Sequence, residues 1–144
     1  MRDAPVMGRR MAERGWQPQV VLSSPATRAI ATARIIAEQL GYPVNDIIVL
    51  DQLYAASSAE LLKVIQGLDD ATQEVMICGH NPGLSELADQ LTAGEVTDIP
   101  TCGAVAIRLD VRKWSAIADA KPAHVEFDHP KAKQKKPGAA DTGV

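Results

Sequence analysis

Two short segments of this 144-residue sequence combine residue types that suit the binding of an anion. One is Ser23-Ser24-Pro25 followed by Arg28, and the other is Gly79-His80-Asn81-Pro82. An arginine offers planar paired donors for two phosphate oxygens, and a histidine can donate a hydrogen bond or move a proton near neutral pH. Taken alone, Arg28 is also typical of a solvated helix arginine, and His80 of a histidine that bonds a loop carbonyl. The segments indicate phosphate chemistry only if the fold brings them together.

Each segment stands where a predicted strand passes into a predicted helix. Apolar runs at 20–22 and 74–78 predict buried strands, and a polar cap with proline at the first helical position follows each one. The first cap is Ser24, and Arg28 lies one turn into that helix, so its guanidinium can reach back over Ser24. Two helix starts with unpaired amides then converge on one crevice at the carboxyl ends of the strands, which predicts an anion site.

The other elements follow from apolar periodicity and from stop signals such as Gly15 and Gly41. Alternating strands and helices predict an α/β fold with three α/β/α layers and a mostly parallel sheet. We expect Trp114, Val125 and Phe127 to dock on its core. The predicted helices span 3–14, 25–40, 57–68 and 82–91. Besides the strands at 20–22 and 74–78, the predicted strands span 47–50 and 101–110.

Composition indicates one domain, residues 1–130, followed by a disordered basic tail, residues 131–144. Of the 15 basic and 18 acidic residues, four lysines and one aspartate lie in that tail, so the domain carries a net charge of about −6. Such a domain is a poor partner for nucleic acid, and an anion must be bound by a local site. No apolar run approaches the roughly 20 residues of a membrane span, and the first residues lack the apolar segment of a secretory signal. These features predict a soluble cytoplasmic protein without a membrane partner. Cys78 and Cys102 match no metal-ligand spacing and are expected to be free.

The two segments belong to a longer pattern that covers nearly the whole domain. In order and spacing it resembles the SixA-type phosphohistidine phosphatases of the histidine phosphatase, or phosphoglycerate mutase-like, superfamily, and its Gly-His-Asn-Pro-Gly element is the most specific part. The pattern consists of Ser24-Pro25-Ala26-Thr27-Arg28 with Thr32-Ala33, Leu53-Tyr54, Gly79-His80-Asn81-Pro82-Gly83, and Pro100-Thr101 before an apolar strand.

The resemblance implies a phosphoglycerate-mutase-like fold and the removal of phosphate from a phosphohistidine on a partner protein or from a related phosphomonoester. It implies a pocket of two histidines and two arginines and no cofactor or metal. Arg28 would be the second arginine, binding phosphate. His80 would be the second histidine, a catalytic group that also holds the phosphoryl oxygens. Tyr54, Ser57 and Thr101 are candidates for the rim of the pocket.

The sequence departs from the family pattern at its beginning. The family's attacking histidine stands in an Arg-His-Gly motif at the end of a first strand, and no Arg-His-Gly occurs in these residues. The other histidines, His124 and His129, are expected at the surface. A sheet without its first strand leaves neighbouring strands short of backbone partners. The chain could be a fragment, a degenerate member that binds without turnover, or a protein that recruits a strand from a second copy.

Two functions therefore remain open at this point: an impaired phosphatase, and a non-catalytic phosphoprotein- or phosphate-binding module. A nucleotide-binding α/β domain is a third and weaker hypothesis, because the sequence contains neither of the glycine-rich nucleotide-binding motifs GxGxxG and GxxxxGK[ST]. The oligomeric state cannot be read from the sequence.

Overall fold

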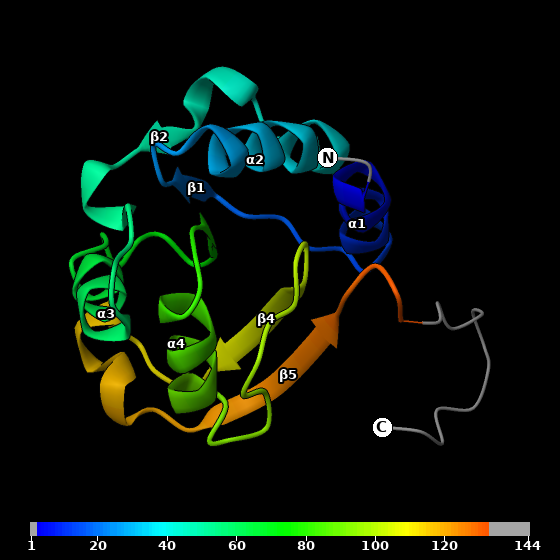
Figure 1. Ribbon diagram of the computed structural model, residues 1–144. Helices are drawn as coiled ribbons and strands as arrows, with labels where there is room; N and C mark the ends of the chain where they lie inside the picture. Colours follow the sequence, from blue (N-terminus) through cyan, green and yellow to red (C-terminus); the bar gives the residue numbers. More distant parts are fainter. Residues whose placement is uncertain (1–2, 133–144) are drawn as a thin grey trace.

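The computed structural model describes residues 3–132, in which helices and strands alternate along most of the chain (Figure 1). The basic tail expected at 131–144 lies outside these residues from position 133 onward. The elements are α1 (Asp3–Glu13), β1 (Val20–Ser23), α2 (Thr27–Leu40), η1 (Val44–Asp46), β2 (Ile48–Val49), η2 (Asp51–Leu53), α3 (Ser58–Gln66), β3 (Val75–Cys78), α4 (Gly83–Leu91), β4 (Ala104–Leu109), η3 (Trp114–Asp119) and β5 (Pro122–Asp128).

The strands form two separate sheets. Three parallel strands lie in the order β2-β1-β3, and β4 and β5 form an antiparallel pair. Within residues 3–132, β3 pairs only with β1 and β4 pairs only with β5. The α/β fold with a mostly parallel sheet is confirmed.

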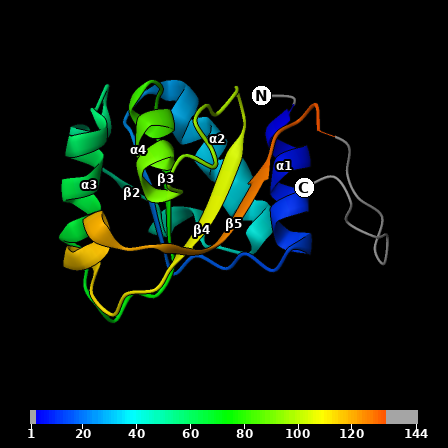
Figure 2. The same ribbon diagram turned by 90° about the horizontal axis from the view of Figure 1, so that it is seen from below.

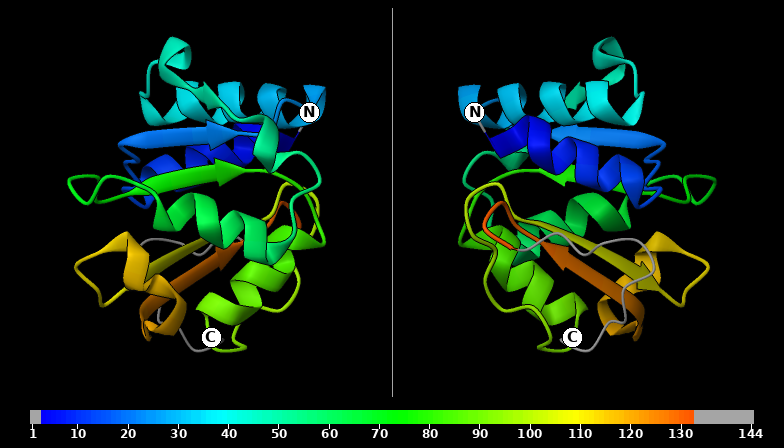
Figure 3. Two further views of the ribbon diagram at one scale, coloured as in Figure 1. Left: turned by 90° about the vertical axis from the view of Figure 1, so that its left-hand side faces the viewer. Right: turned by 90° about the vertical axis from the view of Figure 1, so that its right-hand side faces the viewer.

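Helices cover the sheets on two sides, which makes three layers. The two views of Figure 3 show α3 in front of the strands on one side and α1 on the other. Figure 2 shows α4 and α3 on the side away from α1. The main apolar core lies beneath α3, α4 and η3, where Leu53, Leu61 and Ile117 are almost completely buried. Trp114 joins this core, as expected, and its indole nitrogen donates to the Thr72 carbonyl oxygen at 2.8 Å.

Helix α1 packs on α2 and forms ion pairs with β5. It packs closely on α2 at Gly8, where a Cβ atom would collide with the side chain of Gln39. On its other side Arg10 forms an ion pair with Asp128 at 3.2 Å, and both side chains are nearly buried. Arg14 reaches Glu126 and Asp128 at 3.5 Å each. The helix therefore links the parallel sheet, through α2, to the antiparallel pair.

Some of the predicted helix ends are confirmed, and others are wrong. Gly41 ends α2 with a φ of 74°, as predicted. Ser57 caps α3 in a capping box with Glu60. Helix α2 begins at Thr27 rather than Pro25, and Ser24 is not its cap. None of the helices in residues 3–132 is long and apolar enough to cross a membrane.

The C-terminal part differs most from expectation. The strand predicted from Thr101 begins only at Ala104, because Cys102 takes a left-handed φ of 59° that breaks the extended backbone. Residues 122–128 form a full strand, β5, which periodicity did not identify. Phe127 is 38% exposed on that strand, so the expectation that it docks on the core is wrong.

Candidate phosphate-binding site

The two strand-to-helix corners meet at one edge of the parallel sheet. Strands β1 and β3 are neighbours, and Ser23 is in register with Cys78. The chain therefore turns out of both strands at the same level, and the Ser24 amide still donates to the Cys78 carbonyl oxygen at 2.9 Å. Adjacent parallel strands place their carboxyl ends at one edge, which is where ligands of such sheets bind.

A direct hydrogen bond joins the corners. Ser24 Oγ lies 2.7 Å from His80 Nε2, and Ser24 is fully buried. The Ala26 amide also donates to Ser24 Oγ, at 3.2 Å. When this hydroxyl accepts from Ala26 and donates its proton to His80 Nε2, the neutral imidazole keeps its own proton on Nδ1. The Ser24 side chain thus positions the ring instead of capping α2.

Arg28 and His80 line the same pocket. This hollow has a volume of about 420 Å³, and its walls come from the β1–α2 corner, the loop after η2 and the β3–α4 corner. Arg28 is exposed at the start of α2, and within residues 3–132 no carboxylate lies at ion-pair distance from it. His80 is half-buried at the opposite corner. The pocket is lined by Ala26, Thr27, Arg28, Tyr54, Ala55, His80 and Asn81.

The loop after η2 supplies one wall because it rests on the first turn of α4. A Cβ atom at Gly83 would overlap the carbonyl oxygen of Ala56, so glycine is required for this approach. Ala55, just before it, has a left-handed φ of 51° and lines the pocket. Tyr54 faces His80 with ring centroids 5.8 Å apart and planes at 71°. This loop position therefore explains the last glycine of Gly-His-Asn-Pro-Gly.

Asn81 braces the histidine corner from the other side. Its Nδ2 donates to the Ile99 carbonyl oxygen at 2.7 Å. Its Oδ1 accepts from the amide and hydroxyl of Ser85, at 3.1 and 2.6 Å, and the Ile99 amide donates back to Ser85 Oγ at 2.9 Å. Asn81 thus serves the first turn of α4, as a cap would, although the helix begins two residues later at Gly83. Asn81 also links Ile99, which precedes β4, to the corner that carries His80.

Among the described residues, His80 is the only histidine that lines this pocket, and no cysteine lines it. Cys78 is the nearest thiol in sequence, and burial raises its pKa to about 12, which keeps it protonated at neutral pH. Burial and the charge of Asp3 also raise the pKa of Cys102. His124 is exposed and pairs with Glu126 at 2.9 Å, and His129 lies beside Phe127, so both histidines stand outside the pocket. Residues 3–132 contain no cluster of three or more His, Cys, Asp or Glu suited to a metal ion.

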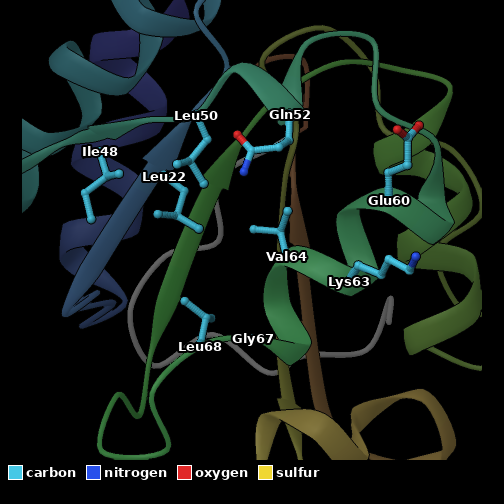
Figure 4. A pocket seen from close by; sticks show the side chains of 9 residues that line it. All are labelled: Leu22, Ile48, Leu50, Gln52, Glu60, Lys63, Val64, Gly67 and Leu68. Carbon is cyan, nitrogen blue, oxygen red and sulfur yellow. The ribbon is translucent and has the colours of Figure 1, made fainter.

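A second and larger groove shares no lining residue with the pocket of Arg28 and His80. It has a volume of about 630 Å³ and runs between β2 and α3 (Figure 4). Leu22, Ile48 and Leu50 line one wall, and Val64 and Leu68 line the other. Its charged groups, Glu60 and Lys63, stand apart from the apolar floor in Figure 4. It contains no convergent set of polar groups and does not suit a phosphate.

Sequence reasoning identified Arg28, His80 and Tyr54, and the structure brings all three to one pocket. Ser57 and Thr101, which were expected at the rim, do not line it, and the Ser57 hydroxyl is used by the capping box of α3. The roles of Ser24 and Ser85 were missed. Neither residue has a sequence signal for its role, because each acts through a partner brought close by the fold.

Comparison with known proteins agrees with this geometry. Residues 1–54 match the model of the histidine phosphatase superfamily, branch 1. A curated Arabidopsis thaliana protein, the uncharacterized chloroplastic protein At3g52155, is 25% identical over 120 residues, which cover 78% of this chain and 55% of that protein. The chain therefore spans little more than half the length of this relative.

Solved structures of SixA proteins share the fold. A protein assigned as phosphohistidine phosphatase SixA from Agrobacterium tumefaciens is 29% identical, with a TM-score of 0.58 over 65% of this chain and 58% of that one. A SixA from Nakamurella multipartitia is 19% identical, with a TM-score of 0.71 over 91% and 81%. A protein histidine phosphatase SixA complexed with tungstate is 20% identical, with a TM-score of 0.68 over 88% and 76%. The match to the histidine phosphatase superfamily, branch 1, covers residues 1–54, and the structural neighbours of the chain are SixA proteins.

Proposed function

We propose that this chain binds the phosphoryl group of a phosphohistidine on a partner protein, or of a related phosphomonoester, as the phosphate-binding part of a SixA-like phosphatase site. The observation that carries the proposal is the pocket shared by Arg28 and His80. A guanidinium that has no carboxylate partner within residues 3–132 and a half-buried imidazole face one hollow at the carboxyl ends of parallel strands.

The two side chains have complementary roles toward a tetrahedral dianion. Arg28 donates two parallel hydrogen bonds to two oxygens. His80 is held at Nε2 by Ser24, so Nδ1 is the ring's remaining donor in the tautomer described above. The SixA structure solved with tungstate supports this role, because tungstate is a tetrahedral oxyanion like phosphate.

Turnover needs an attacking group in addition. In the proposed reaction a histidine nitrogen bonds to phosphorus while the bond to the leaving group breaks and the leaving group takes a proton. Arg28 and His80 stabilise the charge on the phosphoryl oxygens, and water then hydrolyses the phosphoenzyme to phosphate and free histidine. The 144 residues contain no Arg-His-Gly. We therefore expect this chain to bind without turning over, which keeps a non-catalytic phosphoprotein-binding role as the second candidate.

Oxyanion binding tests the pocket. Inorganic phosphate and tungstate are titrated into ¹⁵N-labelled protein, and dissociation constants are taken from the shifts of pocket amides. Arg28→Ala and His80→Ala should each weaken binding about 5- to 150-fold, the equivalent of about 1 to 3 kcal/mol for a charged hydrogen bond. Arg34→Ala, an exposed arginine of the same helix outside the pocket, is the matched control and should bind as the parent does. Equal affinity in all four proteins would rule the pocket out.

A turnover assay separates the two candidates. The substrates are a phosphorylated histidine carrier protein and a small aryl phosphate. The 144-residue chain should release no phosphate, whereas the same chain extended at its N-terminus by a strand ending in Arg-His-Gly should release it, and His80→Ala should abolish that gain. Release by the unextended chain would contradict the account of the attacking group. An inert extended chain that still binds phosphate would favour the non-catalytic role.

A further inference from the structure

We propose that Tyr54 is a specificity-determining residue, and that it favours phosphate carried on a planar ring, such as imidazole or phenyl, over phosphate carried on an aliphatic alcohol. The inference rests on the proposed function, because it concerns what lies beyond the phosphoryl group in the same pocket. It distinguishes ligands that the phosphate contacts alone cannot, since phosphohistidine, aryl phosphates and sugar phosphates all present the same dianion.

Tyr54 lines the pocket with a largely exposed ring. Tyr54 is 63% exposed, more than any other large apolar side chain in residues 3–132. It is nevertheless close to the reacting region, because its ring meets His80 with centroids 5.8 Å apart and planes at 71°. A ligand whose phosphoryl group reaches His80 and Arg28 must extend its leaving group past this ring.

Packing of the fold does not account for an aromatic residue here. The adjacent Leu53 is the residue that anchors the loop, with only 1% of its surface exposed in the core. Tyr54 itself buries little, and a small polar residue would fit the same exposed position. An exposed aromatic side chain beside a binding pocket is a frequent recognition element, because it offers a large flat face and loses little conformational freedom on binding.

Contacts on both sides of Tyr54 fix the backbone that carries its ring. The Tyr54 amide donates to the Asp51 carbonyl oxygen at 3.0 Å. Ala55 is left-handed, and Ala56 lies against Gly83, where no side chain would fit. A surface that is already positioned gives more net affinity than one that must be ordered on binding.

The rest of the pocket offers no alternative flat surface. Besides Arg28 and His80, its lining side chains are small or polar: Ala26, Thr27, Ala55 and Asn81. The amide of Asn81 is already occupied by Ile99 and Ser85. Tyr54 is therefore the one lining residue that could stack on a planar leaving group and is not assigned to the phosphoryl oxygens.

The test compares phenyl phosphate, methyl phosphate and inorganic phosphate, titrated into ¹⁵N-labelled protein at a pH where both esters are dianions. Parent protein should bind phenyl phosphate about 2- to 12-fold more tightly than methyl phosphate, the range typical of one aromatic contact. Tyr54→Ala should remove that preference, and Tyr54→Phe should keep it because the ring remains. Tyr42→Ala, at the opposite end of α2, is the control and should keep it too. Inorganic phosphate should bind equally to all four proteins.

The outcomes separate this inference from the proposed function. Phosphate binding with the same ester preference in Tyr54→Ala as in the parent would overturn the role of Tyr54 and leave the phosphate pocket standing. Loss of the preference in Tyr54→Phe would also overturn it, because the hydroxyl and not the ring would then be the recognised group. Failure of inorganic phosphate to bind the parent protein would overturn the proposed function, and the inference with it.

Discussion

Ser24 Oγ and His80 Nε2, which belong to different strand-to-helix corners, lie 2.7 Å apart. This bond crosses from β1 to the end of β3 and is the shortest link between the two halves of the pocket. Ser24 is fully buried, so its hydroxyl takes its partners from within the protein. The orientation of His80 is thus set by a residue that does not line the pocket.

Ser24→Ala should therefore change both stability and the state of His80. It removes the hydrogen bonds of the Ser24 hydroxyl to His80 Nε2 and to the Ala26 amide, which together contribute about 1 to 3 kcal/mol to the free energy of unfolding. In ¹⁵N NMR of the histidine ring, parent protein should show the tautomer protonated on Nδ1, and the variant should show a mixture. Ser23→Ala is the control, since Ser23 is equally buried but donates only to the Ser24 carbonyl oxygen. An unchanged His80 spectrum in Ser24→Ala would refute the positioning role.

Gly83→Ala should destabilise the protein and disturb the loop that carries Tyr54. A methyl group there collides with the Ala56 carbonyl oxygen, which is backbone and cannot rotate away. We expect a loss of about 1 to 3 kcal/mol in urea unfolding, as for other overpacked sites. Gly79→Ala is a matched control four residues earlier, because its added carbon meets only Leu84, at an ordinary 3.8 Å. Equal stability of the two variants would show that the Ala56 contact does not constrain the fold.

Asp128→Ala should remove the ion pair between α1 and β5 and lower the stability of the fold. The change leaves Arg10, which is nearly buried, without its carboxylate, and removal of one partner of such a pair costs about 3 to 5 kcal/mol. The exposed pair His124–Glu126 offers the comparison, and His124→Ala should cost at most about 1 kcal/mol. Thermal unfolding of both variants is the measurement. A small effect at Asp128 would mean that packing on α2, and not the ion pair, holds α1.

The capping box of α3 should make stability depend on pH. The backbone amide and then the hydroxyl of Ser57 lower the pKa of Glu60 below its usual value of 4.5. A carboxyl whose pKa is lower in the folded state stabilises the fold above its unfolded pKa, and this contribution disappears as pH falls through the folded pKa. The stability difference between parent and Glu60→Gln should thus be present near neutral pH and shrink in acid. A difference that stays constant across that range would contradict the assignment.

Elements whose signals are local could be predicted from the sequence. Gly41 marks the end of a helix through its own backbone freedom, and this prediction is confirmed. The meeting of the corners was also predictable, because parallel neighbouring strands place their ends together whatever their side chains. These two kinds of rule were enough to bring Arg28 and His80 to one pocket.

Features that depend on long-range contacts were not predictable. Ser24 has the residue type and position of a helix cap, but His80 takes its hydroxyl and α2 starts later. Residues 122–128 are extended because they pair with β4, and Phe127 is 38% exposed on this strand. The brace formed by Asn81, Ser85 and Ile99 joins residues up to 18 positions apart. Such contacts exist only once the chain has folded.

The division into two sheets has a consequence for deuterium exchange. In a strand paired on one edge only, alternate amide protons point away from the partner strand. Strand β3 is paired only with β1 in residues 3–132, and each residue from Val75 to Cys78 keeps part of its surface exposed. Amides in this strand should therefore fall into a slow and a fast class in alternation along the chain. Fast protons would thus occur between the two helical layers, a region that in most α/β domains is the last to take up deuterium.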